Sequence, residues 1–351
     1  MNIELLLGLE FLTFLSLEGT TIYFKQNDRK NTAYKLDKTK NILISFFKNN
    51  TIETIPRNVS DYMSEDLKQR LIIQEENITE NLKEEFSYII KNFKETLNQH
   101  GQKYNLFYLY NLKNLKISQE YLTKLEKFKK VIFNNQIVLG EYDPILDIIN
   151  LYDDNINTFN HEMLHLSSNN PFTTESGFRF IGYNNNNQIY KDYKSLSKID
   201  KEEGLNNENF ITIGRGLNEG YTDLLNIRYF NNPKPTYKKL SKLAYMIEQF
   251  YEDPKDMEKD YFLGSFNNLL AELIKTMSKE EAIEIILGLD YINEHPDNII
   301  VYYKLINKMF NIYSNNSGNK DTEKFLEIKN SNITKSLKKQ REIWHFIPKM
   351  V

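Results

Sequence analysis

Two histidines four residues apart, His161 and His165, enclose Glu162 in the pattern HEMLH. On a helix, residues four apart lie on one face, so both imidazoles could bind one tetrahedral metal ion. Glu162 would lie at the edge of that face, where it could act as general base on a metal-bound water without binding the metal. The chain has five histidines, and a chance match has a probability of roughly one in a hundred or less. The alternative is a helix whose histidines serve only in hydrogen bonds.

A second segment, residues 214–230, could supply the third protein ligand that a catalytic zinc site needs. As a helix beginning near Leu217, it would place Glu219 and Asp223 four apart on one face. Glu219 could then bind the metal, and Asp223 could accept the free ring N–H of a ligating histidine. Gly220, between them, would let this helix lie close to the HEMLH helix. The alternative for this segment alone is an ordinary solvated helix face.

HEMLH followed by Asn218-Glu219-Gly220-x-x-Asp223 resembles the gluzincin group of zinc metallopeptidases, whose thermolysin-like members carry H-E-x-x-H and then N-E-x-x-x-D. The metzincin pattern fails, because Ser168 and Pro171 stand where that group has glycine and histidine. The resemblance covers the two motif helices and a strand before the first. It implies bound Zn2+, a peptide or protein substrate, and a cleft between a sheet-bearing part and a helical part. The implied roles are metal ligand for His161, His165 and Glu219, general base for Glu162, and orientation of a histidine for Asp223.

The resemblance also implies a tyrosine and a distal histidine that stabilise the oxyanion, and no motif places either of them. Phe210 stands where thermolysin itself has the tyrosine. Other hydrogen-bond donors could take this role. The chain offers Tyr221, Arg215, Tyr183, His295 and His345. Each also has a purely structural interpretation, such as a hairpin position for Tyr183.

Composition indicates a folded protein without a specialised surface. The 351 residues are 40% hydrophobic and 13% aromatic, which is enough to bury a core in one or two lobes. The 45 basic and 48 acidic residues are mixed along the chain and leave a net charge of -3, so a nucleic-acid role has little support. The absence of cysteine excludes disulfides, thiolate ligands and a cysteine nucleophile. No apolar run reaches the roughly 20 residues of a membrane span and the start lacks a signal-peptide pattern, so a cytoplasmic location is favoured.

The order of the predicted elements indicates an α+β protein with a zincin-like fold, in which a small sheet packs on the HExxH helix beside a mostly helical C-terminal lobe. Residues 1–100 are predicted to form a β-rich region and an amphipathic helix over 79–99. Residues 101–234 would form the catalytic region, with strands in NLFYLYNL, VIFNNQIVLGEYD and ILDIINLY and a basic helical stretch between the first two. In residues 235–351 the apolar spacing is helical.

The predicted function is a zinc-dependent metallopeptidase in which Glu162 activates the water that hydrolyses a peptide bond. The strand in residues 145–152 would be a sheet edge that captures an extended substrate. Two alternatives stay open: a catalytically inactive zincin-like protein for binding or scaffolding, and a protease that cleaves one regulatory partner. Retention of Glu162 argues against the first, because a structural metal site has no use for it. The motifs leave cleavage preference and oligomeric state open, and the basic run 338–341 is predicted to be a solvated helix face.

Overall fold

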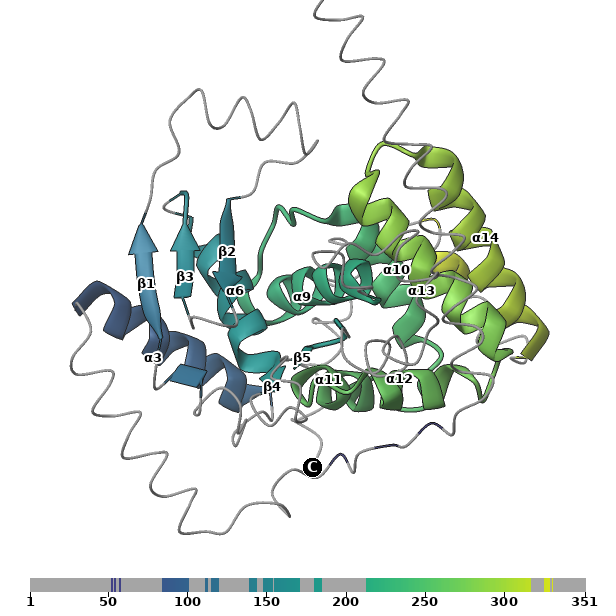
Figure 1. The fold of residues 1–351 in the computed structure, drawn as a ribbon, viewed down its shortest axis with the longest axis horizontal. Coiled ribbons are helices and arrows are strands. Elements are labelled where there is room, and N and C mark those ends of the chain that lie inside the picture. Colours follow the sequence, from purple (N-terminus) through teal and green to yellow (C-terminus); the bar gives the residue numbers. More distant parts are fainter. Residues whose placement is uncertain are drawn as a thin grey trace, which may run out of the picture.

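The computed structural model places a small sheet on one side of a helical body. In Figure 1 the sheet and helix α3 lie on one side, helices α10, α12, α13 and α14 lie on the other, and α6, α9 and α11 lie between them. The structure describes residues 52, 54, 57, 84–100, 111–112, 115–119, 139–143, 148–153, 155–170, 180–184, 213–316, 325–328 and 330. The expected β-rich stretch over residues 1–60 and the basic run 338–341 lie outside these residues, apart from positions 52, 54 and 57.

The sheet consists of β1 (Lys116–Gln119), β2 (Gly140–Asp143) and β3 (Ile148–Leu151) in the order β1-β3-β2. β1 runs parallel to β3 and β2 runs antiparallel to it. The prediction that residues 145–152 form a sheet edge is therefore wrong, because β3 has a strand on each side. β1 also falls in the basic stretch that we expected to be helical, since pairing with β3 outweighs its local helical pattern.

Helix α3 (Glu84–Gln99) confirms the amphipathic helix predicted over 79–99, within the part of that range that the structure describes. Its apolar side chains Ile90, Phe93 and Leu97 are buried, as their helical spacing predicts. The strand predicted in NLFYLYNL is wrong at its end, because Asn111 and Leu112 are helical. Asn111 Nδ2 donates hydrogen bonds to the backbone oxygens of Leu166 (2.8 Å) and Asn169 (2.6 Å), at the end of the helix that carries HEMLH.

That helix, α6 (Ile156–Ser168), carries HEMLH and lies at the centre of the molecule. It begins at Asn155, whose side chain accepts a hydrogen bond from the backbone N–H of Asn157. Every residue from 158 to 168 is buried. The helix packs against β2 and β3 on one side and α9 on the other, and it is followed by the short pair β4 (Asn169–Asn170) and β5 (Phe180–Ile181). Polar side chains on a helix that is buried on all sides are stable only where they have hydrogen-bond partners.

Helix α9 (Arg215–Phe230) carries the second motif and is capped from a distant helix. Gly214, at its start, has φ 87° and offers no capping side chain. Asp290 of α13 takes over this function, because its carboxylate accepts hydrogen bonds from the N–H groups of Gly214 (2.9 Å) and Gly216 (2.7 Å). The start of the helix that bears Glu219 is thus held by the C-terminal lobe.

Gly220 does not face the HEMLH helix, as we expected, but helix α10 (Lys238–Glu248). A Cβ on Gly220 would lie 2.5 Å from the backbone oxygen of Leu240, so only glycine permits this approach. The expectation failed because helical spacing places a residue on a face without saying which neighbour covers that face.

The C-terminal lobe is helical, as the apolar spacing after residue 235 predicts. It contains α10, α11 (Pro254–Phe262), α12 (Phe266–Leu273), α13 (Lys279–Glu294) and α14 (Ile299–Asn316). The structure is therefore rich in helix with one small mixed sheet, which is compatible with an α+β class. Among the described helices, none combines the length and the apolar character needed to cross a lipid bilayer.

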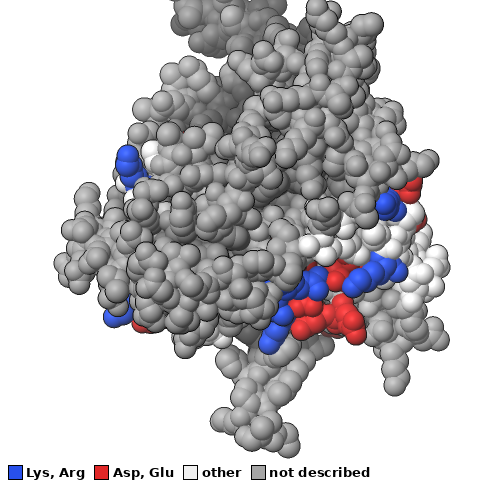
Figure 2. Space-filling view, turned by 60° about the horizontal axis from the view of Figure 1, so that its bottom comes forward, with Lys and Arg blue, Asp and Glu red and all other residues white. Residues whose placement is uncertain are grey.

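Ion pairs join these helices to α9 and to the N-terminal region. Arg228, near the end of α9, binds Glu248 of α10 at 2.8 Å and Glu258 of α11 at 2.5 Å. Arg57 binds Asp260 of α11 through two nitrogens, 2.9 and 3.0 Å from the carboxylate oxygens. Figure 2 shows acidic and basic side chains next to one another on the face that includes the bottom of Figure 1, where α11 and α12 lie.

Replacing Asp290 with alanine should lower the free energy of unfolding by about 1 to 2 kcal/mol, because two N–H groups at the start of α9 lose their acceptor. Chemical denaturation of wild type and Asp290→Ala at pH 5 measures this difference. Equal midpoints and slopes would show that the cap is not stabilising.

The same carboxyl makes stability depend on pH. Burial raises the pKa of Asp290 to about 7, although the two backbone hydrogen bonds oppose this shift. The folded protein then binds more protons than the unfolded chain between about pH 4 and 7, so this contribution to stability is lost as the pH rises through that range. Asp290→Asn keeps one acceptor oxygen and cannot titrate. The free energy of unfolding of Asp290→Asn, relative to that of wild type, should therefore be higher at pH 8 than at pH 5. The same difference at both pH values would contradict the raised pKa of Asp290.

Candidate metal centre

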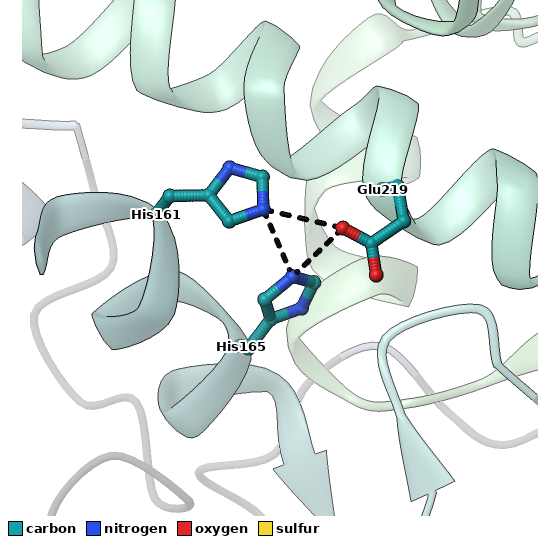
Figure 3. Close-up of side chains that lie close together, drawn as sticks. All are labelled: His161, His165 and Glu219. Carbon is teal, nitrogen blue, oxygen red and sulfur yellow. Dashed lines mark hydrogen bonds and ion pairs between the residues drawn. The ribbon is translucent and has the colours of Figure 1, made fainter. Parts of the chain in front are cut away.

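His161 and His165 of α6 and Glu219 of α9 point toward one another at the contact between the two helices (Figure 3). The Nε2 atoms of the two imidazoles lie 3.1 Å apart. Glu219 Oε2 lies 3.3 Å from Nε2 of His161 and 3.4 Å from Nε2 of His165. The exposed fractions of the side chains are 9% for His161, 8% for His165 and 17% for Glu219, so the cluster is largely shielded from solvent.

These separations fit a tetrahedral metal ion. Zinc binds imidazole nitrogen and carboxylate oxygen at about 2.0 to 2.2 Å, so two ligand atoms of a tetrahedral site lie roughly 3.3 Å apart. The three distances in this cluster lie close to that value. Two imidazoles and one carboxylate form a ligand set that zinc and non-haem iron both use, and in a tetrahedral site these three ligands leave a fourth position for water or substrate.

His161 is oriented by Asp223, one turn beyond Glu219 on α9. Asp223 Oδ1 lies 3.0 Å from Nδ1 of His161, and only 1% of the Asp223 side chain is exposed. Its other oxygen accepts a hydrogen bond from the backbone N–H of Tyr237 at 2.5 Å. With Nδ1–H donated to the carboxylate, Nε2 of His161 carries the lone pair that a metal requires.

His165 is oriented by two neighbours on α9. The side-chain amide of Asn218 lies 3.2 Å and the Thr222 hydroxyl 3.5 Å from Nδ1 of His165. The Thr222 hydroxyl donates to the backbone oxygen of Asn218 at 2.7 Å and shares a hydrogen bond with the hydroxyl of Tyr261 at 2.6 Å. This chain of contacts ties the second imidazole to α11.

The charges in the cluster shift the pKa values of its members in opposite directions. Burial alone would raise the pKa of Glu219, but the charges and hydrogen bonds of His165 and His161 hold it well below its ordinary value. Burial alone would lower the pKa of His161, but hydrogen bonds to Asp223 and Glu219 raise it well above its ordinary value. The pocket therefore favours a positive charge between these side chains, which a metal cation can supply.

Glu162 lies beside the cluster and has a different environment. Burial raises its pKa, while the charges of His161 and His165 lower it less. Strand β2 passes close to it: a Cβ on Gly140 would lie 3.3 Å from Glu162 Cγ. Within the described residues, no hydrogen bond of the Glu162 carboxylate is found. Its oxygens are thus not committed to a structural contact.

The structure distributes the predicted oxyanion donors over different parts of the molecule. The Tyr221 hydroxyl donates to Glu248 at 3.0 Å, and the Tyr183 hydroxyl donates to the backbone oxygen of Met257 at 2.6 Å. Both tyrosines are fully buried and their hydroxyls are used in the core. His295 ends α13, with its ring 4.6 Å from that of Tyr291. Arg215 is exposed and lies one helical turn before Glu219, and Phe210 and His345 lie outside the described residues.

Three residues at the centre escaped sequence reasoning. Asn218 belongs to the quoted motif, but its contact with His165 was not predicted. Thr222 lies one turn beyond it, which was a usable signal because residues four apart share a helix face. Tyr237 had no such signal, since it reaches the centre through the packing of α10 on α9.

Comparison with protein-family models, curated proteins and solved structures gave no significant match. The resemblance to gluzincins therefore rests on the two motifs alone, and the metal, its identity and the reaction are proposals.

The geometry predicts one bound zinc ion per chain. His161→Ala and Glu219→Gln should abolish stoichiometric zinc binding, and Asp223→Asn should weaken it about 10- to 100-fold, because the orienting acceptor is lost. Metal analysis after dialysis against graded chelator measures these effects. Glu162→Gln serves as the control and should keep its zinc. Zinc retention by Glu219→Gln at wild-type affinity would contradict the ligand assignment.

Proposed function

We propose that this protein is a metal-dependent hydrolase, specifically a zinc metallopeptidase with a zincin-like fold. The observation that supports the proposal most is the mutual spacing of three ligand atoms, at 3.1 to 3.4 Å, beside an uncommitted carboxylate. A structural zinc site closes all four positions with protein ligands, whereas this set provides three. The fourth position and the neighbouring Glu162 suit a hydrolytic site.

A zinc ion in this position would polarise a carbonyl group and acidify water. Glu162 acts as the general base: one of its carboxylate oxygens takes a proton from the attacking water and then passes that proton to the leaving amine nitrogen. Burial suits Glu162 to this task, because a raised pKa makes a carboxylate a stronger base. Asp223 keeps Nδ1–H of His161 engaged, so the imidazole stays in its ligating orientation.

The proposed substrate is a peptide or protein in extended conformation. In the sheet as described, β2 is an edge strand, and it lies next to Glu162 through Gly140. An edge strand can pair with an extended chain through backbone hydrogen bonds. We therefore propose β2, in place of residues 145–152, as the strand that pairs with the substrate, because its residue Gly140 lies next to Glu162.

Glu162→Gln should lower kcat for peptide hydrolysis by roughly 10²- to 10⁴-fold, because an amide cannot accept the proton. Bound zinc should stay at the wild-type level. Digestion of a mixed peptide library with zinc-loaded protein, followed by kinetics on the best-cleaved peptide, gives both values.

Glu284→Gln is the matched control, since it makes the same chemical change at an ion pair with Lys308 between α13 and α14. Its kcat should equal that of wild type. Full activity in Glu162→Gln would contradict the proposed mechanism. A wild type that binds zinc tightly and cleaves nothing in the library would favour the binding protein or the single-substrate protease.

A further inference from the structure

Arg57 occupies an acidic pocket formed by α11 and α12. Its guanidinium donates hydrogen bonds to both carboxylate oxygens of Asp260 at 2.9 and 3.0 Å, to Asp256 at 3.1 Å and to Glu272 at 2.7 Å. It also lies over the ring of Tyr251, with 5.8 Å between the guanidinium carbon and the ring centroid. The ion pairs join residues that are 199 to 215 positions apart, so Arg57 fastens a distant part of the chain to the C-terminal lobe.

Asp260 is the acidic residue of this pocket that depends most on Arg57. Its side chain has no exposed surface, whereas that of Asp256 is 28% exposed. Burial raises the pKa of Asp260, and the hydrogen bonds from Arg57 oppose this shift most strongly. Tyr251 and Asn268 also donate to the carboxylate, at 3.1 and 2.8 Å, but neither brings a positive charge. Without Arg57, α11 would have to shift to give this carboxylate access to water or a proton, because an unpaired buried charge is costly.

Tyr261, the next residue on α11, reaches both motif helices behind the metal centre. Its side chain is fully buried, and its hydroxyl lies 2.6 Å from that of Thr222 on α9. The side chain of Ser168, at the end of α6, also forms a hydrogen bond with it. The Thr222 hydroxyl gives its own proton to the backbone oxygen of Asn218, so towards other groups its oxygen can only accept. That oxygen faces Nδ1 of His165 at 3.5 Å, the ring atom that carries the proton when Nε2 binds a metal.

We propose that Arg57 is a positioning residue for the metal centre. By pairing with Asp260 it holds α11 where the Tyr261 hydroxyl supports Thr222, and Thr222 in turn orients the imidazole of His165. Asp260 and Tyr261 are neighbours on one helix, so a shift that exposes the carboxylate also moves the hydroxyl away from α9. Hydrogen bonds weaken steeply with such displacements. This inference rests on the proposed metal centre, and it extends the control of that centre to a residue outside both motifs.

Arg57→Ala should weaken zinc binding about 3- to 30-fold, the range for a residue that acts through a network of contacts. Competition with a chromophoric chelator measures the affinity, at a temperature at which circular dichroism shows wild type and variant fully folded. Lys308→Ala is the matched control, because it removes a cation from the ion pair with Glu284 and should bind zinc like wild type. If Arg57 only stabilises the fold, Arg57→Ala will unfold at a lower temperature with unchanged zinc affinity, and that result would overturn the proposal.

A double-mutant cycle tests whether the effect passes through Tyr261. Tyr261→Phe removes only the hydroxyl, so adding Arg57→Ala to it should change zinc affinity by less than about 2-fold. Independent, additive effects of the two substitutions would overturn the proposed route. Arg57→Lys keeps the charge without the two-pronged contact and should bind zinc with intermediate affinity, which provides the test if Arg57→Ala does not fold.

These measurements need no peptide cleavage, so they separate the role of Arg57 from the proposed reaction. Unchanged affinity in both Arg57 variants, beside a wild type that binds zinc, would refute the role of Arg57 and leave the proposed function standing. A wild type that binds no zinc would refute the metal centre and this inference with it.

Discussion

Two imidazoles and one carboxylate meet where α6 lies on α9, and their close spacing constrains the rest of the molecule. At most 17% of any of these side chains is exposed, and the facing atoms lie 3.1 to 3.4 Å apart. Lone pairs that face one another in a shielded site must share a cation or protons, because leaving them unpaired costs several kcal/mol. The tetrahedral spacing favours a metal ion as the shared cation.

Helix α9 is held at this distance from α6 by contacts with three other helices. Asp290 of α13 caps its start, and Arg228 joins its end to α10 and α11. Between these points, Gly220 lets α10 approach the backbone of α9. A helix fixed at both ends and along its middle keeps the Glu219 carboxylate in position without a ligand, which is the preorganisation that a binding site needs.

Polar groups near the centre fall into two kinds. Most are used to position ligands or to close the core, such as Asp223, Asn218 and the hydroxyl of Tyr261. The Glu162 carboxylate is different, because it has no hydrogen-bond partner within the described residues. A carboxylate without a structural partner, next to the two histidines, is what the proposed role of Glu162 as general base requires.

The sequence by itself determined the local features: helices α3, α6 and α9, the helical character after residue 235, and the shared face of His161 and His165. These follow from the period of 3.6 residues, which acts within one helix. Tertiary structure alone decided that β1 is a strand, that β3 lies inside the sheet, that Gly220 faces α10, and that Asp290 caps α9. It also brought Tyr237 to His161. Such contacts join residues far apart in the chain, and no local pattern encodes them, because pairing and packing depend on which surfaces meet.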